Sequence, residues 1–312
     1  MELFAGPDDA GRRLDRILRK ALPDYSLSLI HRLLRQGNVM VDGKPAGPGA
    51  RIQSGSVIQV VIHKNPAIPT PPSPTPHSPP SHPLPEIIWR GAGIIVFNKP
   101  PGLAAHGNSS LDTLVNAWLA GTLPASLSFK PGPLHRLDKP TSGAIAFSQT
   151  IEGARLFSRL LRERQWTKTY LAIVEGSVSG EHLWRDTLAR NTALRKTFAD
   201  NGTGAKDAVT AVKPLVSGNS HTLIEACIVT GRTHQIRAQA AAHGHPLAGD
   251  VKYGGKTATG HAGGFFLHAW KMQLAGPARF GPLANFPQPL IAPLPEAFLS
   301  RIHTLFPDFR LH

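Results

Sequence analysis

The sequence predicts an α+β protein of two domains. Residues 1–64 show helical spacing followed by short alternating strands, and three later segments, 168–174, 208–215 and 222–229, alternate apolar and polar residues as half-buried strands do. A Pro-rich run separates the two regions, and a length of 312 residues at about 150 residues per domain also suggests two domains. Hydrophobic residues make up 41% of the chain, enough to bury a sizeable core, which excludes wholesale disorder.

The charge balance indicates a polyanionic partner. The chain carries 34 Lys and Arg against 20 Asp and Glu, a formal net charge of +14. It lacks an apolar run of the ~18 residues that a membrane span needs, and its acidic start does not resemble a signal peptide. A single Cys leaves no disulfide framework. We therefore expect a cytoplasmic protein with no membrane association.

Residues 1–64 are predicted to form a small module of two helices and a short sheet. The apolar residues of 14–21 repeat at helical spacing and leave Arg and Lys on the opposite face. Ser26 and Ser28 are candidate N-caps of a second helix. Short strands are predicted at 39–41 and 57–62. From the pattern alone, the basic helix face is equally consistent with a polyanion-binding surface and with an ordinary solvated one.

A linker is predicted at 65–85, where 10 of the 21 residues are Pro and none is charged. This composition favours solvated polyproline II, which at ~3.1 Å per residue reaches about 65 Å. A flexible spacer is its commoner use, and a ligand for SH3-type modules is the alternative. We therefore expect the first domain to act as a tether for the second domain, 86–312.

One loop of the second domain gathers polar groups of several chemical types. Residues 134–143 lie between a Pro-Gly-Pro turn and the apolar strand 144–147. Asp138 is a candidate nucleophile or base there, and its basic neighbours would keep it ionised if it were buried. A surface ion pair is the alternative for an Asp in such a mixed-charge loop.

A second polar loop, 231–237, precedes an Ala-rich helix. Arg232 and Arg237 stand near the N-terminus of that helix and are candidates to bind phosphate or to pair with a carboxylate. Lys99 follows a strand and begins a rigid Pro-Pro-Gly turn, so we expect it to be exposed at a strand end. No His-Glu-x-x-His pattern, Gly-x-Ser-x-Gly elbow or Gly-x-x-x-x-Gly-Lys loop occurs, which argues against a metal site, a serine hydrolase and an NTPase.

Six motifs in 87–312 together resemble the RluA/RluC/RluD-type pseudouridine synthases. They are Lys-Pro-x-Gly at 99–102, His-Arg-Leu-Asp-x-x-Thr-Ser-Gly at 135–143, Lys-Thr-Tyr-Leu-Ala at 168–172, Gly-Arg-Thr-His-Gln-Ile-Arg at 231–237, Gly-His-Pro-Leu-Ala-Gly-Asp at 244–250 and Leu-His-Ala at 267–269. The resemblance implies a pseudouridine synthase fold with a large mixed, mainly antiparallel sheet and a central cleft. It also implies an isomerase that detaches uracil from ribose, turns it and rejoins it through carbon five, without a cofactor.

The resemblance also assigns roles to single residues. Asp138 matches the essential aspartate, which either adds to the anomeric carbon or removes a proton from the neighbouring ribose carbon. Tyr170 matches the tyrosine that stacks on the base and is implicated in removing the proton from carbon five. Arg237 matches the arginine that pairs with the aspartate, and Arg136 the arginine that enters the RNA stack when the uridine is flipped out.

The first module resembles the small RNA-binding module named after ribosomal small-subunit protein four. Arg-Leu-Asp at 13–15, Ser-x-Ser at 26–28 and Gly-x-Val-x-Val-x-Gly-Lys at 37–44 carry this resemblance, which implies a grip on the RNA backbone. The candidate RNA contacts of the whole chain are Arg12, Arg13, Ser26, Ser28, Arg32, Arg35, Lys44, Lys99, Arg136 and Arg232. Such contacts to phosphate give salt-dependent affinity rather than sequence reading.

The function we expect is that of an RNA pseudouridine synthase, an isomerase of uridines in large-subunit (23S) ribosomal RNA. We expect a monomer that needs neither a metal nor a nucleotide cofactor. The alternative is a non-catalytic RNA-binding or ribosome-assembly factor on the same fold, disfavoured because Asp138, Tyr170 and Arg237 are all present. A glycosidase of ordinary sugars needs two carboxylates about 5–10 Å apart, for which the motif loops offer Asp138 and Asp250.

Overall fold

A computed structural model of the chain describes residues 1–61, 82–123, 126–191, 193, 196–200, 202, 204–257, 264–276 and 281–311. Its contacts divide the chain into two units. The first comprises 1–83, 113–132 and 149–151, and the second comprises 84–112, 133–148 and 152–312. The predicted linker at 65–85 lies outside the described residues, except for 82–85. Among the helices of the described residues, none is long and apolar enough to cross a membrane.

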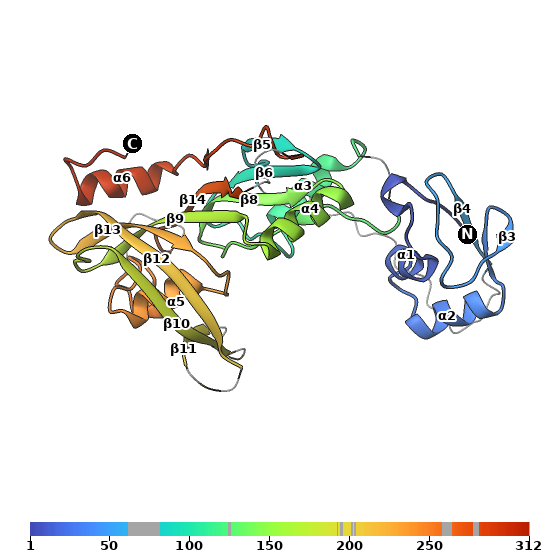
Figure 1. Ribbon diagram of the computed structural model, residues 1–312, viewed down its shortest axis with the longest axis horizontal. Coiled ribbons are helices and arrows are strands. Elements are labelled where there is room, and N and C mark those ends of the chain that lie inside the picture. The colour runs from blue at the N-terminus through green and yellow to red at the C-terminus, as the bar shows by residue number, and fades with distance from the viewer. Residues whose placement is uncertain are drawn as a thin grey trace. The chain divides into compact units, whose positions relative to one another are not determined.

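The first unit contains a small antiparallel sheet, ordered β1-β4-β2-β3, together with α1, α2 and most of α3 (Figure 1). Its elements are β1 (Glu2–Phe4), η1 (Pro7–Asp9), α1 (Leu14–Ala21), α2 (Leu27–Arg35), β2 (Val39–Val41), β3 (Lys44–Pro45), β4 (Val57–Val60) and most of α3 (Leu111–Leu119). The predicted apolar helix face is buried, since Leu14 and Ile17 share one core cluster with Ile58 of the sheet. Ser26 is the N-cap of α2, and its Oγ accepts a hydrogen bond of 3.2 Å from the Leu29 N–H. The two-helix and short-sheet prediction is therefore confirmed.

A buried carboxylate connects the start of the chain to a distant segment of the same unit. Asp9 is fully buried and accepts hydrogen bonds from the backbone N–H groups of Leu127 and Ser128, at 2.8 and 3.0 Å. The hydroxyl groups of Ser126 and Ser128 donate to it as well. In addition, Arg12 Nη1 donates to the Ser128 carbonyl at 3.0 Å. These contacts join residues 9–12 to residues 126–128 within the first unit.

Asp9→Asn is expected to destabilise this unit. Burial alone would raise the pKa of Asp9, but hydrogen bonds from Ser128, Leu127 and Gly6 outweigh it and hold the pKa below its usual 3.8. The ionised form therefore stabilises the fold above the unfolded pKa, and this contribution is lost as pH falls through the lowered pKa. We expect a loss of about 1–3 kcal/mol in the free energy of unfolding at pH 7, which shrinks in acid. Urea titration measures it, and the exposed Asp24→Asn is the control; equal stability of wild type and Asp9→Asn at pH 7 would contradict the role of Asp9.

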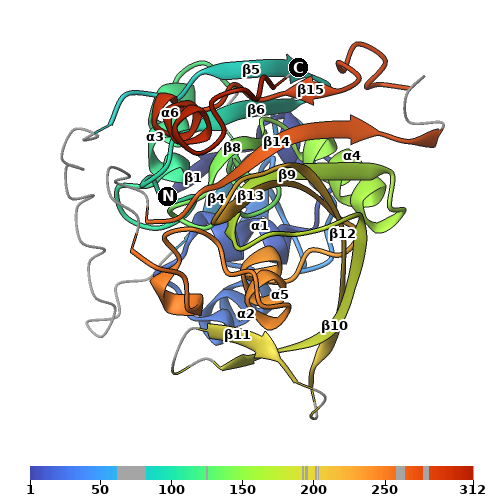
Figure 2. The same ribbon diagram turned by 90° about the vertical axis from the view of Figure 1, so that its left-hand side faces the viewer.

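The second unit is built on one large mixed sheet (Figures 1 and 2). Within the described residues, eleven strands take part, in the order β11-β10-β12-β13-β9-β14-β8-β6-β5, with β15 beside β14 and β7 beside β8. Along this order every pair is antiparallel except β14 with β8. The bounds are β5 (Ile87–Gly91), β6 (Ile94–Lys99), β7 (Gly132–Pro133), β8 (Ser142–Ser148), α4 (Ile151–Arg162), β9 (Trp166–Glu175), β10 (His182–Asn191), β11 (Lys196–Ala199), β12 (Lys206–Ser217), β13 (His221–Ile228), α5 (Gln235–Ala242), η2 (Val251–Tyr253), β14 (Leu267–Leu274), β15 (Leu290–Ile291) and α6 (Glu296–Leu305). The predicted α+β fold with a mixed, mainly antiparallel sheet is confirmed.

Helices lie on both faces of this sheet near β9. Phe298 and Ile302 of α6 share a core cluster with Leu171 of β9, whereas α5 lies on the other side of the sheet (Figure 1). Because successive side chains of a strand point to opposite faces, Tyr170 faces away from the α6 cluster. Strand β9 therefore presents Tyr170 on the side where the polar loops gather.

Candidate active site

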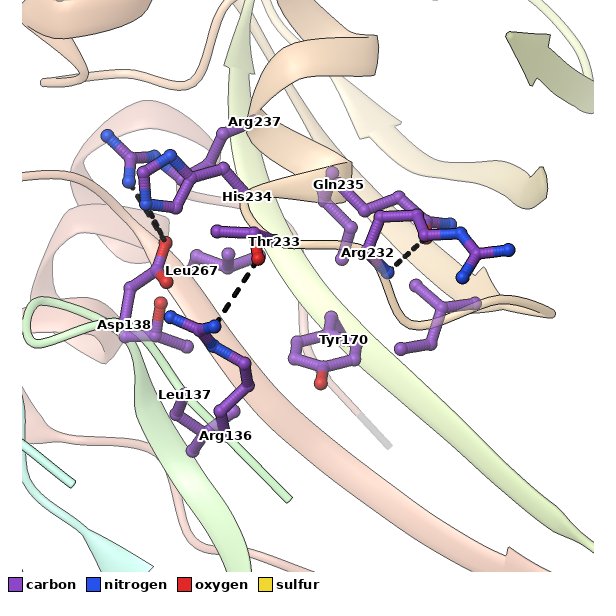
Figure 3. A pocket seen from close by; sticks show the side chains of 13 residues that line it. Arg136, Leu137, Asp138, Tyr170, Arg232, Thr233, His234, Gln235, Arg237 and Leu267 are labelled. Atoms are coloured by element: carbon purple, nitrogen blue, oxygen red, sulfur yellow. Dashed lines mark hydrogen bonds and ion pairs between the residues drawn. The ribbon is translucent and has the colours of Figure 1, made fainter. Parts of the chain in front are cut away.

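The loop before β8, the start of α5 and strand β9 meet at one pocket (Figure 3). Its lining includes Asp138 and Arg136 from the first loop, Arg232 and Arg237 from the second, and Tyr170 from β9. The three residues predicted to carry the chemistry therefore lie around one hollow, although 99 positions separate Asp138 from Arg237.

Arg237 is held between two carboxylates. Its side chain is 7% exposed, and its Nη1 donates to Asp138 Oδ2 at 2.9 Å. Its Nε and Nη2 donate to the two oxygens of Asp250 at 2.7 and 2.9 Å. The guanidinium plane also lies over the rings of Tyr253 and Phe265, 4.8 and 4.3 Å from their centroids. Asp250 thus fixes the arginine through a bidentate fork, and the arginine fixes Asp138.

Two glycines permit the close backbone approaches that position these carboxylates. Gly143, five residues after Asp138, has φ +104°, and a Cβ there would lie 2.3 Å from the Ala269 carbonyl oxygen of β14. Gly255 follows Asp250, and a Cβ there would lie 2.3 Å from the Leu247 carbonyl oxygen. Any other residue would push these segments apart, so both loops depend on glycine for their shape.

A histidine that sequence reasoning left without a role also faces Asp138. His234 Nε2 lies 3.7 Å from Asp138 Oδ2, and its Nδ1 lies 2.9 Å from the Tyr253 hydroxyl. That hydroxyl accepts a hydrogen bond from the Thr197 N–H, so its own proton is free for Nδ1. Burial lowers the pKa of His234, and this effect outweighs the negative charge of Asp138, which by itself would raise the pKa. The lowered pKa favours the neutral ring at pH 7. The ring thus lies between the Tyr253 hydroxyl and the Asp138 carboxylate. The signal available in the sequence was the place of His234 within the second polar loop.

Tyr170 and the two flanking arginines occupy different environments. Tyr170 is buried, and burial together with the nearby charge of Asp138 raises the pKa of its hydroxyl well above the usual 10. Arg136 is exposed, and its Nη1 donates to Thr233 Oγ1 at 3.3 Å (Figure 3). Arg232 is also exposed and donates from Nε to the Asp207 carbonyl at 2.9 Å. Both arginines are thus placed at the pocket with part of the guanidinium group still facing solvent.

Lys99 is buried, whereas the sequence predicted an exposed lysine at a strand end. It is fully buried at the end of β6, and its ammonium group donates to the carbonyls of Pro100, Leu103 and Lys139 at 3.0, 2.7 and 3.2 Å. Burial lowers the pKa of Lys99 to about 7, although the negative charge of Asp138 by itself would raise it. The prediction that Lys99 contacts RNA is therefore corrected, because this lysine ties the first motif to the Asp138 loop from within.

Lys99→Met is expected to change how stability depends on pH. The folded pKa of about 7 lies below the unfolded value of 10.5, so the unfolded chain binds an extra proton between these pH values. The wild type therefore gains stability relative to the variant as pH rises, by at most about 1.4 kcal/mol per pH unit. Urea titrations between pH 7 and 10 measure this gain, with the exposed Lys213→Met as control. A difference in stability that stays constant across this range would contradict the lowered pKa of Lys99.

Some of the predicted RNA contacts of the first unit are exposed, and others already form hydrogen bonds within the protein. Arg32, Arg35 and Lys44 are exposed, as a phosphate contact requires. Arg13 is exposed but forms a two-bond fork with Asp15, at 3.1 and 2.8 Å. The hydroxyls of Ser26 and Ser28 lie 2.9 Å apart, Ser26 serves as the helix cap, and Arg12 is committed to Ser128.

Comparisons with known proteins agree with this fold. Residues 93–242 match the family described as RNA pseudouridylate synthase, and residues 12–58 match the S4 domain. The ribosomal large subunit pseudouridine synthase D of Xylella fastidiosa is 31% identical over 98% of this chain and 92% of its own length. The chain belongs to the RNA pseudouridylate synthase family. The resemblance drawn from the six motifs is confirmed.

Other members of the RNA pseudouridylate synthase family match over different shares of their length. The enzyme of the same name from Neisseria meningitidis serogroup A is 36% identical over 78% of this chain, and the match spans 64% of that relative. Among solved structures, human RNA pseudouridylate synthase domain containing 4 has a TM-score of 0.57 at 24% identity, covering 70% of this chain and 92% of its own. This likeness supports the shared fold.

Proposed function

We propose that the protein isomerises uridines of RNA to pseudouridine and that its substrate is large-subunit ribosomal RNA. The observation that carries the proposal is the Asp138–Arg237–Asp250 arrangement beside Tyr170 in one pocket of this family's fold. The relatives named ribosomal large subunit pseudouridine synthase support the class of RNA. The proposed organisation is an RNA-binding module at 1–64, a linker at 65–85 and a catalytic domain at 86–312, acting as a cytoplasmic monomer without a cofactor.

Asp138 is the proposed group that acts at the ribose. During the reaction the bond from the anomeric carbon to N1 of uracil breaks and a bond from the same carbon to carbon five forms. The proton of carbon five leaves and N1 gains a proton, so that the product is an isomer of uridine. Arg237 orients the carboxylate and stabilises its negative charge through the 2.9 Å hydrogen bond. His234 Nε2 lies 3.7 Å from the same carboxylate, on the pocket side.

Tyr170 is proposed to hold the uracil ring. Since its pKa is raised, the phenol is neutral at pH 7. A neutral ring buried beside Asp138 suits stacking on the base, and it disfavours a phenolate formed in advance as the base for carbon five. Arg136, exposed at the rim, is placed to fill the RNA stack when the uridine is flipped out, which offsets part of the unstacking cost of a few kcal/mol.

Mapping of pseudouridine tests this function. Ribosomal RNA from a strain that lacks the protein is incubated with the purified protein, and carbodiimide adducts are located by primer extension. We expect new adducts at specific uridines of the large-subunit RNA. If the protein creates none in any ribosomal or transfer RNA, the proposal fails.

A further inference from the structure

A second hollow of the same unit adjoins the active-site pocket. The two share Arg136, Tyr170, Ile228 and Arg232 as lining residues. Figure 3 shows the side chains of the first pocket. The second hollow has a volume of about 540 Å³, within the range of about 300–1,000 Å³ found for small-molecule sites. A strand of RNA whose target nucleotide occupies the first pocket therefore has a hollow of sufficient size beside it.

The lining of this second hollow is strongly basic. Four segments contribute its cations, which are Arg136, Arg162, Arg164, Lys168 and Arg232. No Asp or Glu is among the described residues that line it. Positive side chains that converge on a concave surface, without carboxylates among them, favour an anionic ligand. We refer to this site as the basic hollow.

Lys168 is the unusual member of this set. It stands two residues before Tyr170 on β9 and therefore faces the same side of the sheet. It is half-buried, and no residue in the described part of the chain forms a hydrogen bond or ion pair with its ammonium group. Burial lowers the pKa of Lys168 to about 8. Its charge thus lacks both full hydration and a protein partner, which is costly unless a ligand supplies one.

Lys99 shows how the same fold treats a structural lysine. Three carbonyl oxygens surround its ammonium group at 2.7–3.2 Å, and it lines neither the pocket nor the basic hollow. Lys168 differs on both counts, because it lines an open hollow and has no carbonyl acceptor among the described residues. This contrast favours a ligand-binding role for Lys168.

We propose that the basic hollow binds the phosphate of a nucleotide adjoining the target uridine, with Lys168 as its partly buried cation and Arg162 and Arg164 as exposed support. The inference rests on the proposed function, since Tyr170 and Arg136 place the target nucleotide in the neighbouring pocket. A phosphodiester supplies the negative charge and the acceptor oxygens that the ammonium group lacks.

Binding of a short RNA tests this inference. The probe is a fluorescein-labelled five-nucleotide RNA with one central uridine, followed by fluorescence anisotropy. We expect Lys168→Gln to weaken binding about tenfold or more, Lys168→Arg to retain most of the affinity, and the exposed Lys213→Gln to bind as the wild type does. Replacing the phosphate at Lys168 with an uncharged methylphosphonate should weaken binding of the wild type and leave that of Lys168→Gln unchanged.

Two results would overturn the inference. One is equal affinity of the wild type and Lys168→Gln. The other is a loss that persists whichever linkage is neutralised, because Lys168 would then act through the fold. Removal of a partly buried charge without a protein partner should leave the melting temperature of Lys168→Gln unchanged or raised. Lys168→Met is the second variant, and it should weaken RNA binding as Lys168→Gln does. An RNA that binds through Lys168 without release of tritium from carbon five would contradict the proposed function alone.

Discussion

Asp138→Asn is expected to lower the rate of tritium release from RNA labelled at carbon five of uracil by about a thousandfold or more. Asparagine keeps the size of the side chain and still offers an oxygen to Arg237. It lacks the negative charge and the basicity that a step at the ribose requires. Single-turnover measurements at saturating RNA isolate this chemical step from binding.

Asp186→Asn is the matched control for this variant. The Asp186 side chain is 16% exposed, as is that of Asp138, and it accepts a hydrogen bond from Gln239 away from the pocket lining. We expect it to retain near wild-type rates. Asp138→Asn should remain folded, since Asp250 still neutralises Arg237. Wild-type turnover by a folded Asp138→Asn protein would contradict the assignment of Asp138.

Arg237→Met is expected to damage both stability and activity. Methionine fills a similar volume but leaves Asp250, whose side chain is 2% exposed, without its partner. Breaking a buried pair in this way costs about 3–5 kcal/mol, which corresponds to a fall of about 10 °C in melting temperature for a unit of this size. Asp138 also loses its orienting donor, so we expect the single-turnover rate to fall about a hundredfold or more. Thermal unfolding and tritium release measure the two effects.

A double variant separates these two effects. Asp250→Asn added to Arg237→Met removes the unpaired charge, so we expect it to recover part of the melting temperature and none of the rate. Arg155→Met, an exposed arginine of α4, is the control and should change neither quantity. An Arg237→Met protein that melts with the wild type would show that the pair does not hold the site together.

The fold was largely accessible from the sequence because its elements have strong local patterns. The alternation of apolar and polar residues predicted β9, β12 and β13, and the helical spacing of apolar residues from Leu14 onward predicted α1. The pairing of strands was not accessible, since the parallel contact of β14 with β8 depends on tertiary packing and on the close approach at Gly143. The contacts of Asp9 were missed for a related reason, as Leu127 and Ser128 lie 118 and 119 positions away in no recognisable motif.

The site was accessible only in part. The pairing of Asp138 with Arg237 followed from the family resemblance, whereas the fork of Asp250 on Arg237 requires the folded turn that brings the two side chains together. Lys99 was placed at the surface because lysine is almost always exposed. Three backbone carbonyls from two loops accept its hydrogen bonds. The sequence alone does not indicate that these carbonyls converge on one lysine.

Whether the protein isomerises uridine in RNA is tested most directly by comparing the tritium released from carbon five with the pseudouridine formed in the same RNA. We expect equal amounts of the two, no free uracil, and neither product with Asp138→Asn. Tight binding of RNA without release of tritium would contradict the proposed function and favour a non-catalytic RNA-binding factor on this fold.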